Sequence, residues 1–109
     1  MSYKIKTISV FEKNLKKLAK KYPSIKIDFE ELIENLEQNP EQGVPLGSNV
    51  YKIRMNITSK NKGKSGGARV IAHIIIKDET VYLLTIYDKS SQNTISDLEI
   101  RRLIKLIEE

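Results

Sequence analysis

The pattern of apolar and polar positions changes its period along this chain, and each period predicts one kind of element. Tyr3 and Ile5 alternate with lysines, which is typical of a short strand with one solvated face. Apolar residues then recur at helical spacing over residues 10–21 and again over 24–38, so both segments predict amphipathic helices. Pro23 disfavours helix in the residue before it. We therefore expect the two helices to form an antiparallel hairpin.

The second half of the chain shows the two-residue period of strands. A turn-rich connector is expected over 40–49. Residues 51–57 then alternate between apolar and polar side chains, residues 67–76 are almost continuously apolar, and residues 81–89 are also largely apolar. Continuous apolarity predicts a central strand covered on both faces. The links between these segments are short, so the last three strands should form an antiparallel meander.

Two serines are expected to cap helices. Ser9 stands three residues before Glu12, and Ser96 stands three residues before Glu99, which is the spacing of a capping box. The resulting order is β-α-α-β-β-β-α. This order predicts an α+β fold with a mainly antiparallel four-stranded sheet, a helical hairpin on one face and a C-terminal helix over part of the other.

Length and composition limit the number of domains and the kinds of metal site that the chain can have. A chain of 109 residues fits one domain, taken as residues 1–109. The absence of cysteine excludes a disulfide framework and a thiolate metal site, and the single histidine, His73, excludes a histidine-rich one. We therefore expect neither a metal nor a cofactor. No segment resembles a signal peptide or a membrane span, which predicts a cytoplasmic protein.

The charges are unevenly distributed along the chain. Residues 1–27 carry eight lysines and one glutamate, and residues 42–77 carry seven basic residues and no acid. Between them, residues 28–41 hold six acids and no base. A concentrated positive field attracts polyanions, with an affinity that falls as salt rises. The pattern favours a nucleic-acid partner, and a basic domain that binds no nucleic acid remains the alternative.

Candidate anion-binding residues follow the strand pattern. Arg54 and Arg69 lie on neighbouring predicted strands, where a guanidinium group needs water or an anion. Between them runs a glycine-rich loop that contains Lys60, Lys62 and Lys64. Glycine allows a backbone to approach a ligand closely, and lysine is a mobile charge for phosphate. The loop is not a P-loop, because a strand and not a helix follows it.

Three further residues have chemistry that suits a site. His73 shares a strand face with Arg69 and is a possible general acid or base, although a lone histidine in an apolar strand is more often a packed core residue. Lys89 ends the last strand, at a place where ligands can bind. Tyr87, two residues earlier, could stack on an RNA base, or it could belong to the core.

The segments "VYKIRM", "SGGARVIAHIII" and "VYLLTIYDKS", together with the lysine–glycine loop between the first two, resemble the RelE/ParE superfamily of bacterial type II toxins. The resemblance is to the RelE/HigB-like branch and covers nearly the whole chain in the order and length of its elements. It implies a RelE-like fold and a toxin encoded beside an antitoxin. Members of the RelE type enter the ribosome and cut messenger RNA without a metal.

The resemblance also implies roles for individual residues. In such members the ribose 2′-OH attacks the adjacent phosphorus and leaves a 2′,3′-cyclic phosphate. Arg69 matches the family's arginine that contacts the scissile phosphate, and Lys89 matches a basic residue at the end of the last strand. The predicted catalytic residues are Arg69, Lys89, Lys64 and His73, and the predicted RNA-binding residues are Arg54, Lys60, Lys62, Lys64 and Tyr87.

One departure from the family pattern keeps alternatives open. RelE has a tyrosine shortly after the last basic residue, and here Ile95 stands near that place. Either His73 or a loop lysine then takes the proton, or cleavage is weak. The departure also leaves open a ParE-like inhibitor of DNA gyrase without nuclease activity. A non-toxic basic domain that binds RNA or protein is the third reading. The predicted partners are a cognate antitoxin, the ribosome and messenger RNA.

Overall fold

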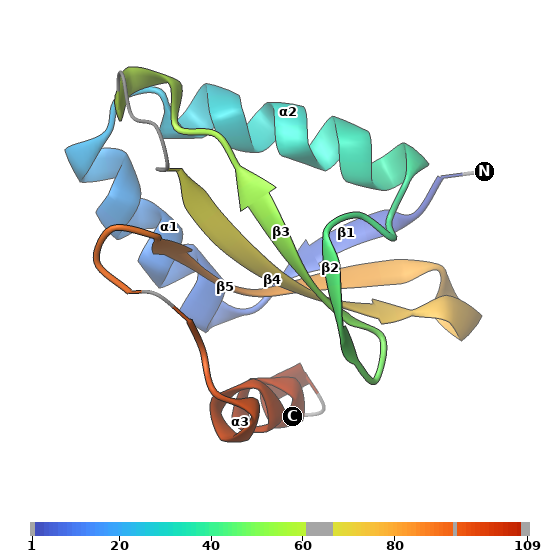
Figure 1. Cartoon of the computed structure of the whole chain (residues 1–109). Coiled ribbons are helices and arrows are strands. Elements are labelled where there is room, and N and C mark those ends of the chain that lie inside the picture. The colour runs from blue at the N-terminus through green and yellow to red at the C-terminus, as the bar shows by residue number, and fades with distance from the viewer. Residues whose placement is uncertain (1, 61–66, 93, 108–109) are drawn as a thin grey trace.

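A five-stranded mixed sheet forms the centre of the computed structural model, with helices on both faces (Figure 1). The structure describes residues 2–60, 67–92 and 94–107. In chain order the elements are β1 (Lys4–Thr7), α1 (Ser9–Lys21), α2 (Ile25–Gln38), β2 (Val44–Gly47), β3 (Val50–Met55), the 3-10 turn η1 (Thr58–Lys60), β4 (Ala68–Ile75), the 3-10 turn η2 (Ile76–Asp78), β5 (Thr80–Asp88) and α3 (Asp97–Ile107).

The strands lie in the order β1-β5-β4-β3-β2. β1 runs parallel to β5, whereas β2, β3, β4 and β5 form antiparallel pairs. The predicted α+β class and meander are therefore confirmed, and the first strand joins the sheet as expected. The sheet has one more strand than predicted.

The additional strand is β2, which the sequence suggested would be part of a connector. Val44, Pro45 and Leu46 are exposed, so no alternation of buried and exposed side chains marks the strand. Proline is tolerated in β2 because this strand is at the edge of the sheet, where one row of backbone groups faces away from a partner. The prediction of a turn-rich connector over 40–49 was wrong in this part.

Two apolar cores fix the layers. α1 and α2 pack over one face of the sheet on Val70, Ala72 and Ile74 of β4, and α3 packs over the other face on Ile71 (Figure 1). Ile71 has no exposed surface. The prediction of a central strand covered on both faces is confirmed, and so is the placement of α3 opposite the helical hairpin.

Only one of the two predicted serine caps forms. The Ser96 hydroxyl oxygen accepts a hydrogen bond from the Glu99 amide at 3.1 Å at the start of α3. Ser9 instead lies inside α1, whose N-cap residue is Ile8 and has no side-chain cap. The Glu12 carboxylate accepts a hydrogen bond from the Thr7 hydroxyl. The chain leaves β1 only two residues before α1, and this short connection places Ser9 one position too late to cap.

Candidate functional site

Arg54 and Arg69 are direct cross-strand partners in the β3–β4 pair. Side chains in this relation have Cβ atoms about 5 Å apart and project from the same face of the sheet. Arg54 is exposed, and Arg69 is only 7% exposed. The Arg69 guanidinium donates a hydrogen bond to the Ala68 carbonyl oxygen at 3.2 Å. The register therefore brings two positive charges side by side on one face of the sheet.

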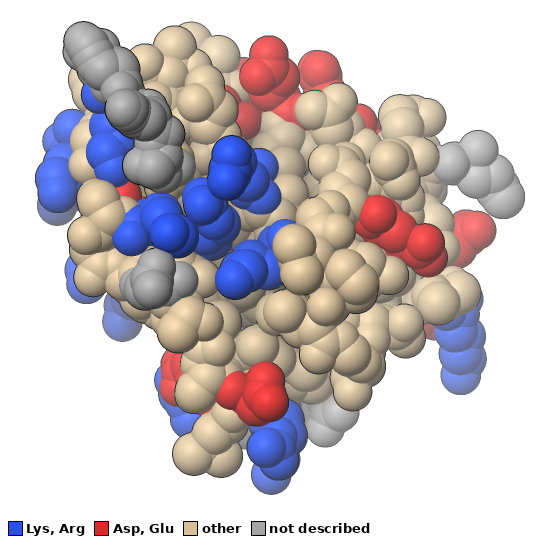
Figure 2. Space-filling view, viewed as in Figure 1, with Lys and Arg blue, Asp and Glu red and all other residues tan. Residues whose placement is uncertain are grey.

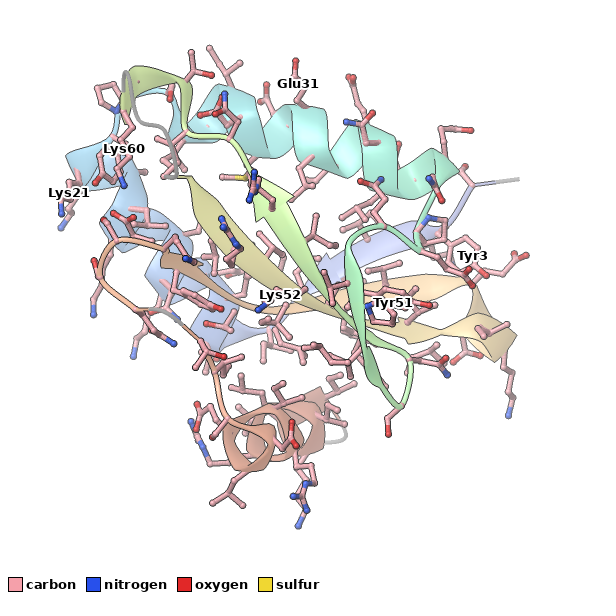
Figure 3. The ribbon with its side chains drawn as sticks, in the orientation of Figure 1. Tyr3, Lys21, Glu31, Tyr51, Lys52 and Lys60 are labelled. Carbon is pink, nitrogen blue, oxygen red and sulfur yellow. The ribbon has the colours of Figure 1, made fainter. Side chains whose placement is uncertain are left out.

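Two lysines extend this positive surface. Lys52 lies two residues before Arg54 on β3 and projects from the same face (Figure 3). Lys89 follows β5 directly, and its amide donates to the Gly67 carbonyl oxygen at 3.1 Å. Tyr87, two residues before Lys89, has Arg69 as its cross-strand partner, and if the alternation of β5 continued by one residue it would put Lys89 on that same face. We call Lys52, Arg54, Arg69 and Lys89 the cationic face.

Figure 2 shows Lys and Arg side chains gathered over β3, β4 and the end of β5, with acidic side chains along α2 above them. A shallow hollow of about 90 Å³ lies at this boundary, between Glu31 and Asn35 of α2 and Arg54 of β3. A polyanion on the cationic face would be repelled on the α2 side. The favourable path therefore runs across the strands below α2.

A buried carboxylate lies directly beneath the cationic face. Asp88 is 4% exposed. Its carboxylate accepts hydrogen bonds from the Tyr22 hydroxyl at 2.8 Å, the Lys60 ammonium at 2.9 Å, and the Ser90 amide and hydroxyl at 3.0 and 2.8 Å. Lys60 also donates to the Ser90 hydroxyl at 3.1 Å. We call these four residues the Asp88 cluster.

The cluster shifts the pKa of both of its charged groups. Burial by itself would raise the pKa of Asp88, but the hydrogen bonds from Lys60, Ser90 and Tyr22 outweigh burial and hold this pKa well below its usual range. The hydrogen bond to Asp88 raises the pKa of Lys60. Both groups are therefore charged at neutral pH, as an ion pair.

Lys60 is one of the predicted RNA-binding residues, and the structure places its ammonium group in this ion pair. The Lys60 side chain is 19% exposed, and its Nζ lies 5.6 Å from the centroid of the Tyr22 ring. Figure 3 shows the side chain beside the end of α1, away from Lys52. Lys62 and Lys64, the other predicted loop lysines, lie outside the described residues.

His73 lies on β4 as the sequence suggested, whereas Tyr87 lies in the core. His73 lies four residues along β4 from Arg69, which is about 13 Å of strand. Burial lowers its pKa, against a hydrogen bond with the Asn49 backbone that raises it. Tyr87 is 6% exposed and packs in the core beneath α3. The expectation that its ring stacks on RNA is corrected, because α3 covers that part of the sheet.

A second buried acid was missed by the sequence reading. Asp28 in α2 accepts hydrogen bonds from the Ser24 hydroxyl at 2.7 Å and from the Thr58 amide and hydroxyl at 3.0 and 2.7 Å. These bonds attach η1 to the start of α2. Asp28 follows Ile25 by three positions on a helix face that is otherwise apolar, and this placement was the available signal.

The described residues contain no cluster of three or more His, Cys, Asp or Glu side chains that could hold a metal ion. Within the described part of the chain, no helix is both long enough and apolar enough to cross a bilayer.

Comparisons with known proteins agree on one family. The model of a family described as the RelE toxin of the RelE/RelB toxin–antitoxin system matches residues 8–108. The isolated RelE toxin of E. coli is similar in structure, with a TM-score of 0.61 and 13% identity over 96% of this chain and 99% of that one. A chain of the intact E. coli RelBE toxin–antitoxin complex gives a TM-score of 0.60 and 16% identity, over 78% of this chain and 94% of that chain.

A chain from a RelBE toxin–antitoxin complex of Mycobacterium tuberculosis is also similar, with a TM-score of 0.56 and 16% identity over 79% of this chain and 96% of that one. At these identities the solved structures show a shared fold. The family assignment depends on the family model, which spans nearly the whole chain.

Proposed function

This chain belongs to the RelE toxin family of toxin–antitoxin systems, and from this premise we propose that it stops translation in the cytoplasm by cutting messenger RNA at the ribosome. The cationic face is the observation that supports the proposal. Arg54 and Arg69 stand directly opposite each other on β3 and β4, and Lys89 extends the same face at the end of β5. A rigid sheet thus holds several cations at one region, with Arg54 exposed, Lys89 partly exposed and Arg69 7% exposed beside them.

The proposed reaction is an internal transfer at phosphorus. The 2′-OH loses its proton and attacks the adjacent phosphorus, the bond to the 5′-oxygen of the next nucleotide breaks, and that oxygen gains a proton. The products are a 2′,3′-cyclic phosphate and a 5′-hydroxyl. Negative charge increases on the phosphoryl oxygens in the transition state, and cations held in place at those oxygens stabilise it more than the substrate.

We assign the charge stabilisation to Arg69 with Arg54, because two guanidinium groups on one strand pair can bridge the oxygens of a single phosphate. Lys89 is assigned to the leaving 5′-oxygen, to which its ammonium group can donate a proton. His73 is about 13 Å along β4 from Arg69 and is given no part at this phosphate. Lys64 stays a prediction for the proton acceptor.

An antitoxin is the second proposed partner. The E. coli and M. tuberculosis relatives were solved as toxin–antitoxin complexes. We propose that the antitoxin of this chain inhibits it by covering the cationic face with an acidic segment. Charge complementarity supports this proposal, since the cationic face combines four basic side chains on one surface.

The proposal can be tested by inducing the protein in bacteria and mapping the 5′ ends of messenger RNA by primer extension. New ends inside coding regions that coincide with growth arrest would support ribosome-dependent cleavage. Growth arrest without new ends, together with lost supercoiling activity of DNA gyrase, would favour the ParE-like alternative. Unimpaired growth at full expression would refute both toxin readings.

A further inference from the structure

The Asp88 cluster connects three distant segments at one point. Tyr22 is the C-cap residue of α1, Lys60 ends η1, and Ser90 follows β5. Each contributes a hydrogen-bond donor to the Asp88 carboxylate. A buried ion pair of this kind adds little stability compared with apolar residues of the same size. Its presence at the edge of the proposed site therefore requires another explanation.

The main chain of Asp88 also shapes the turn that carries Lys89. The Asp88 carbonyl oxygen accepts hydrogen bonds from the Ser91 amide at 3.0 Å and the Gln92 amide at 3.1 Å. The Asp88 carboxylate accepts from the Ser90 amide inside the same turn. Lys89 thus lies in a turn that the carbonyl oxygen and the carboxylate of one residue, Asp88, hold together.

The same carboxylate changes the role of Lys60. An ammonium group at 2.9 Å from a buried carboxylate is already neutralised, and releasing it to a phosphate would leave the buried Asp88 charge unpaired. Lys60 therefore contributes no net charge to the surface that RNA would contact.

We propose that Asp88 is a positioning residue of the cationic face: it holds the turn that aims Lys89 and keeps Lys60 out of RNA binding. The inference rests on the proposed function, since it assigns these lysines their parts in RNA binding and cleavage.

The discriminating variant is Asp88→Asn, which keeps the shape of the side chain but removes the charge that holds Lys60. It also leaves the Ser90 amide and hydroxyl with a neutral amide oxygen, which is a weaker acceptor than the carboxylate that holds the turn in the wild-type protein. We expect the freed Lys60 to add one phosphate contact, so that the slope of log affinity against log salt for a short single-stranded RNA becomes steeper by about 0.7. Cleavage of ribosome-bound messenger RNA under single-turnover conditions should fall by about tenfold or more, because Lys89 is less well aimed. A merely structural role predicts weaker binding, not steeper salt dependence.

Two further variants make the assignment specific. Adding Lys60→Met to Asp88→Asn should return the salt slope to the wild-type value while the cleavage rate stays low. Glu99→Gln is the matched control, because it removes the carboxylate of an exposed ion pair with Arg102 on α3 and should change neither quantity. An unchanged cleavage rate in folded Asp88→Asn, or a salt slope that does not steepen, would overturn the proposal.

A measurement on the wild-type protein without RNA tests whether Asp88 holds Lys60, even if Asp88→Asn does not fold. Reductive methylation followed by mass spectrometry should modify Lys60 more slowly than Lys52, because the Lys60 ammonium is held by Asp88. Equal rates of methylation at Lys60 and Lys52 would refute the holding of Lys60 by Asp88, whatever the protein does to RNA. If wild-type protein neither binds nor cleaves RNA while Lys60 is still protected, the proposed function is refuted and the ion pair between Lys60 and Asp88 is still supported.

Discussion

Removing the hydroxyl group of Tyr87 should stabilise the protein. The Tyr87 ring is 6% exposed, and its hydroxyl oxygen is buried without a hydrogen-bond partner among the described residues. A buried hydroxyl that forms no hydrogen bond costs about 1–3 kcal/mol, and burial raises its pKa while the nearby Arg69 lowers it. Tyr87→Phe keeps the ring and its packing beneath α3. We expect the free energy of unfolding to rise by about 1 kcal/mol, which raises Tm by about 4–6 °C.

The same chemical change at two other tyrosines gives the controls. The Tyr22 hydroxyl donates to the Asp88 carboxylate at 2.8 Å, so Tyr22→Phe should destabilise by about 1.5–3 kcal/mol, the range for hydrogen bonds to charged groups. Tyr82 is only half-buried, and Tyr82→Phe should stay within about 0.5 kcal/mol of wild type. The three variants thus compare the loss of a tyrosine hydroxyl group in three environments: buried without a partner, hydrogen-bonded to a carboxylate, and half-buried.

Urea unfolding followed by far-UV circular dichroism is the suitable assay, because the chain has no tryptophan to report by fluorescence. The slope of the unfolding free energy against urea should be equal in all variants, which confirms that each compares the same two states. If Tyr87→Phe destabilises the protein by more than about 0.5 kcal/mol, the hydroxyl has a favourable partner and the reasoning is refuted.

Three further predictions follow from the same structure. Arg69→Ala should abolish growth arrest while circular dichroism shows a folded protein, and persistent arrest would remove Arg69 from the site. Because the pKa of Asp88 is held below its unfolded value of 3.8, the stability that it contributes is present above that pH and is lost as pH falls through the folded pKa; acid titration of Asp88→Asn should therefore show a flatter loss of stability below about pH 5. Ile71→Ala should lower the free energy of unfolding by about 2–5 kcal/mol in urea, since Ile71 is fully buried between β4 and α3, and a loss below about 1 kcal/mol would contradict this packing.

Local patterns were sufficient for the elements and for part of the site. The two-residue period and the short links placed Arg54 and Arg69 on neighbouring strands, and the register of the structure makes them direct partners. The edge strand β2 was not predictable in this way, because Val44 and Leu46 are both exposed and Pro45 usually marks a turn. An edge strand is formed by backbone pairing, which leaves little trace in side-chain pattern.

The Asp88 cluster was missed for a different reason. Tyr22 and Lys60 lie 66 and 28 positions from Asp88 in the sequence, and no local period connects them. The sequence places Lys60 in the glycine-rich loop as an RNA-binding residue, because the 3-10 turn that positions it beside Asp88 has no distinct signal. The burial of Tyr87 depends on where α3 packs, and amphipathicity shows that a helix packs without showing on which residues.

The parallel pairing of β1 with β5 has a consequence for how the protein is made. Lys4 pairs with Thr80, and Thr7 pairs with Leu83, so the first strand has no partner until almost all of the sheet has been synthesised. At 5–20 residues per second, a ribosome needs about 4–16 s to make the intervening residues. Lys89 and the turn that holds it are added later still. For that interval a nascent chain has no complete sheet, and any activity that the assembled cationic face supports has to wait for the last strand.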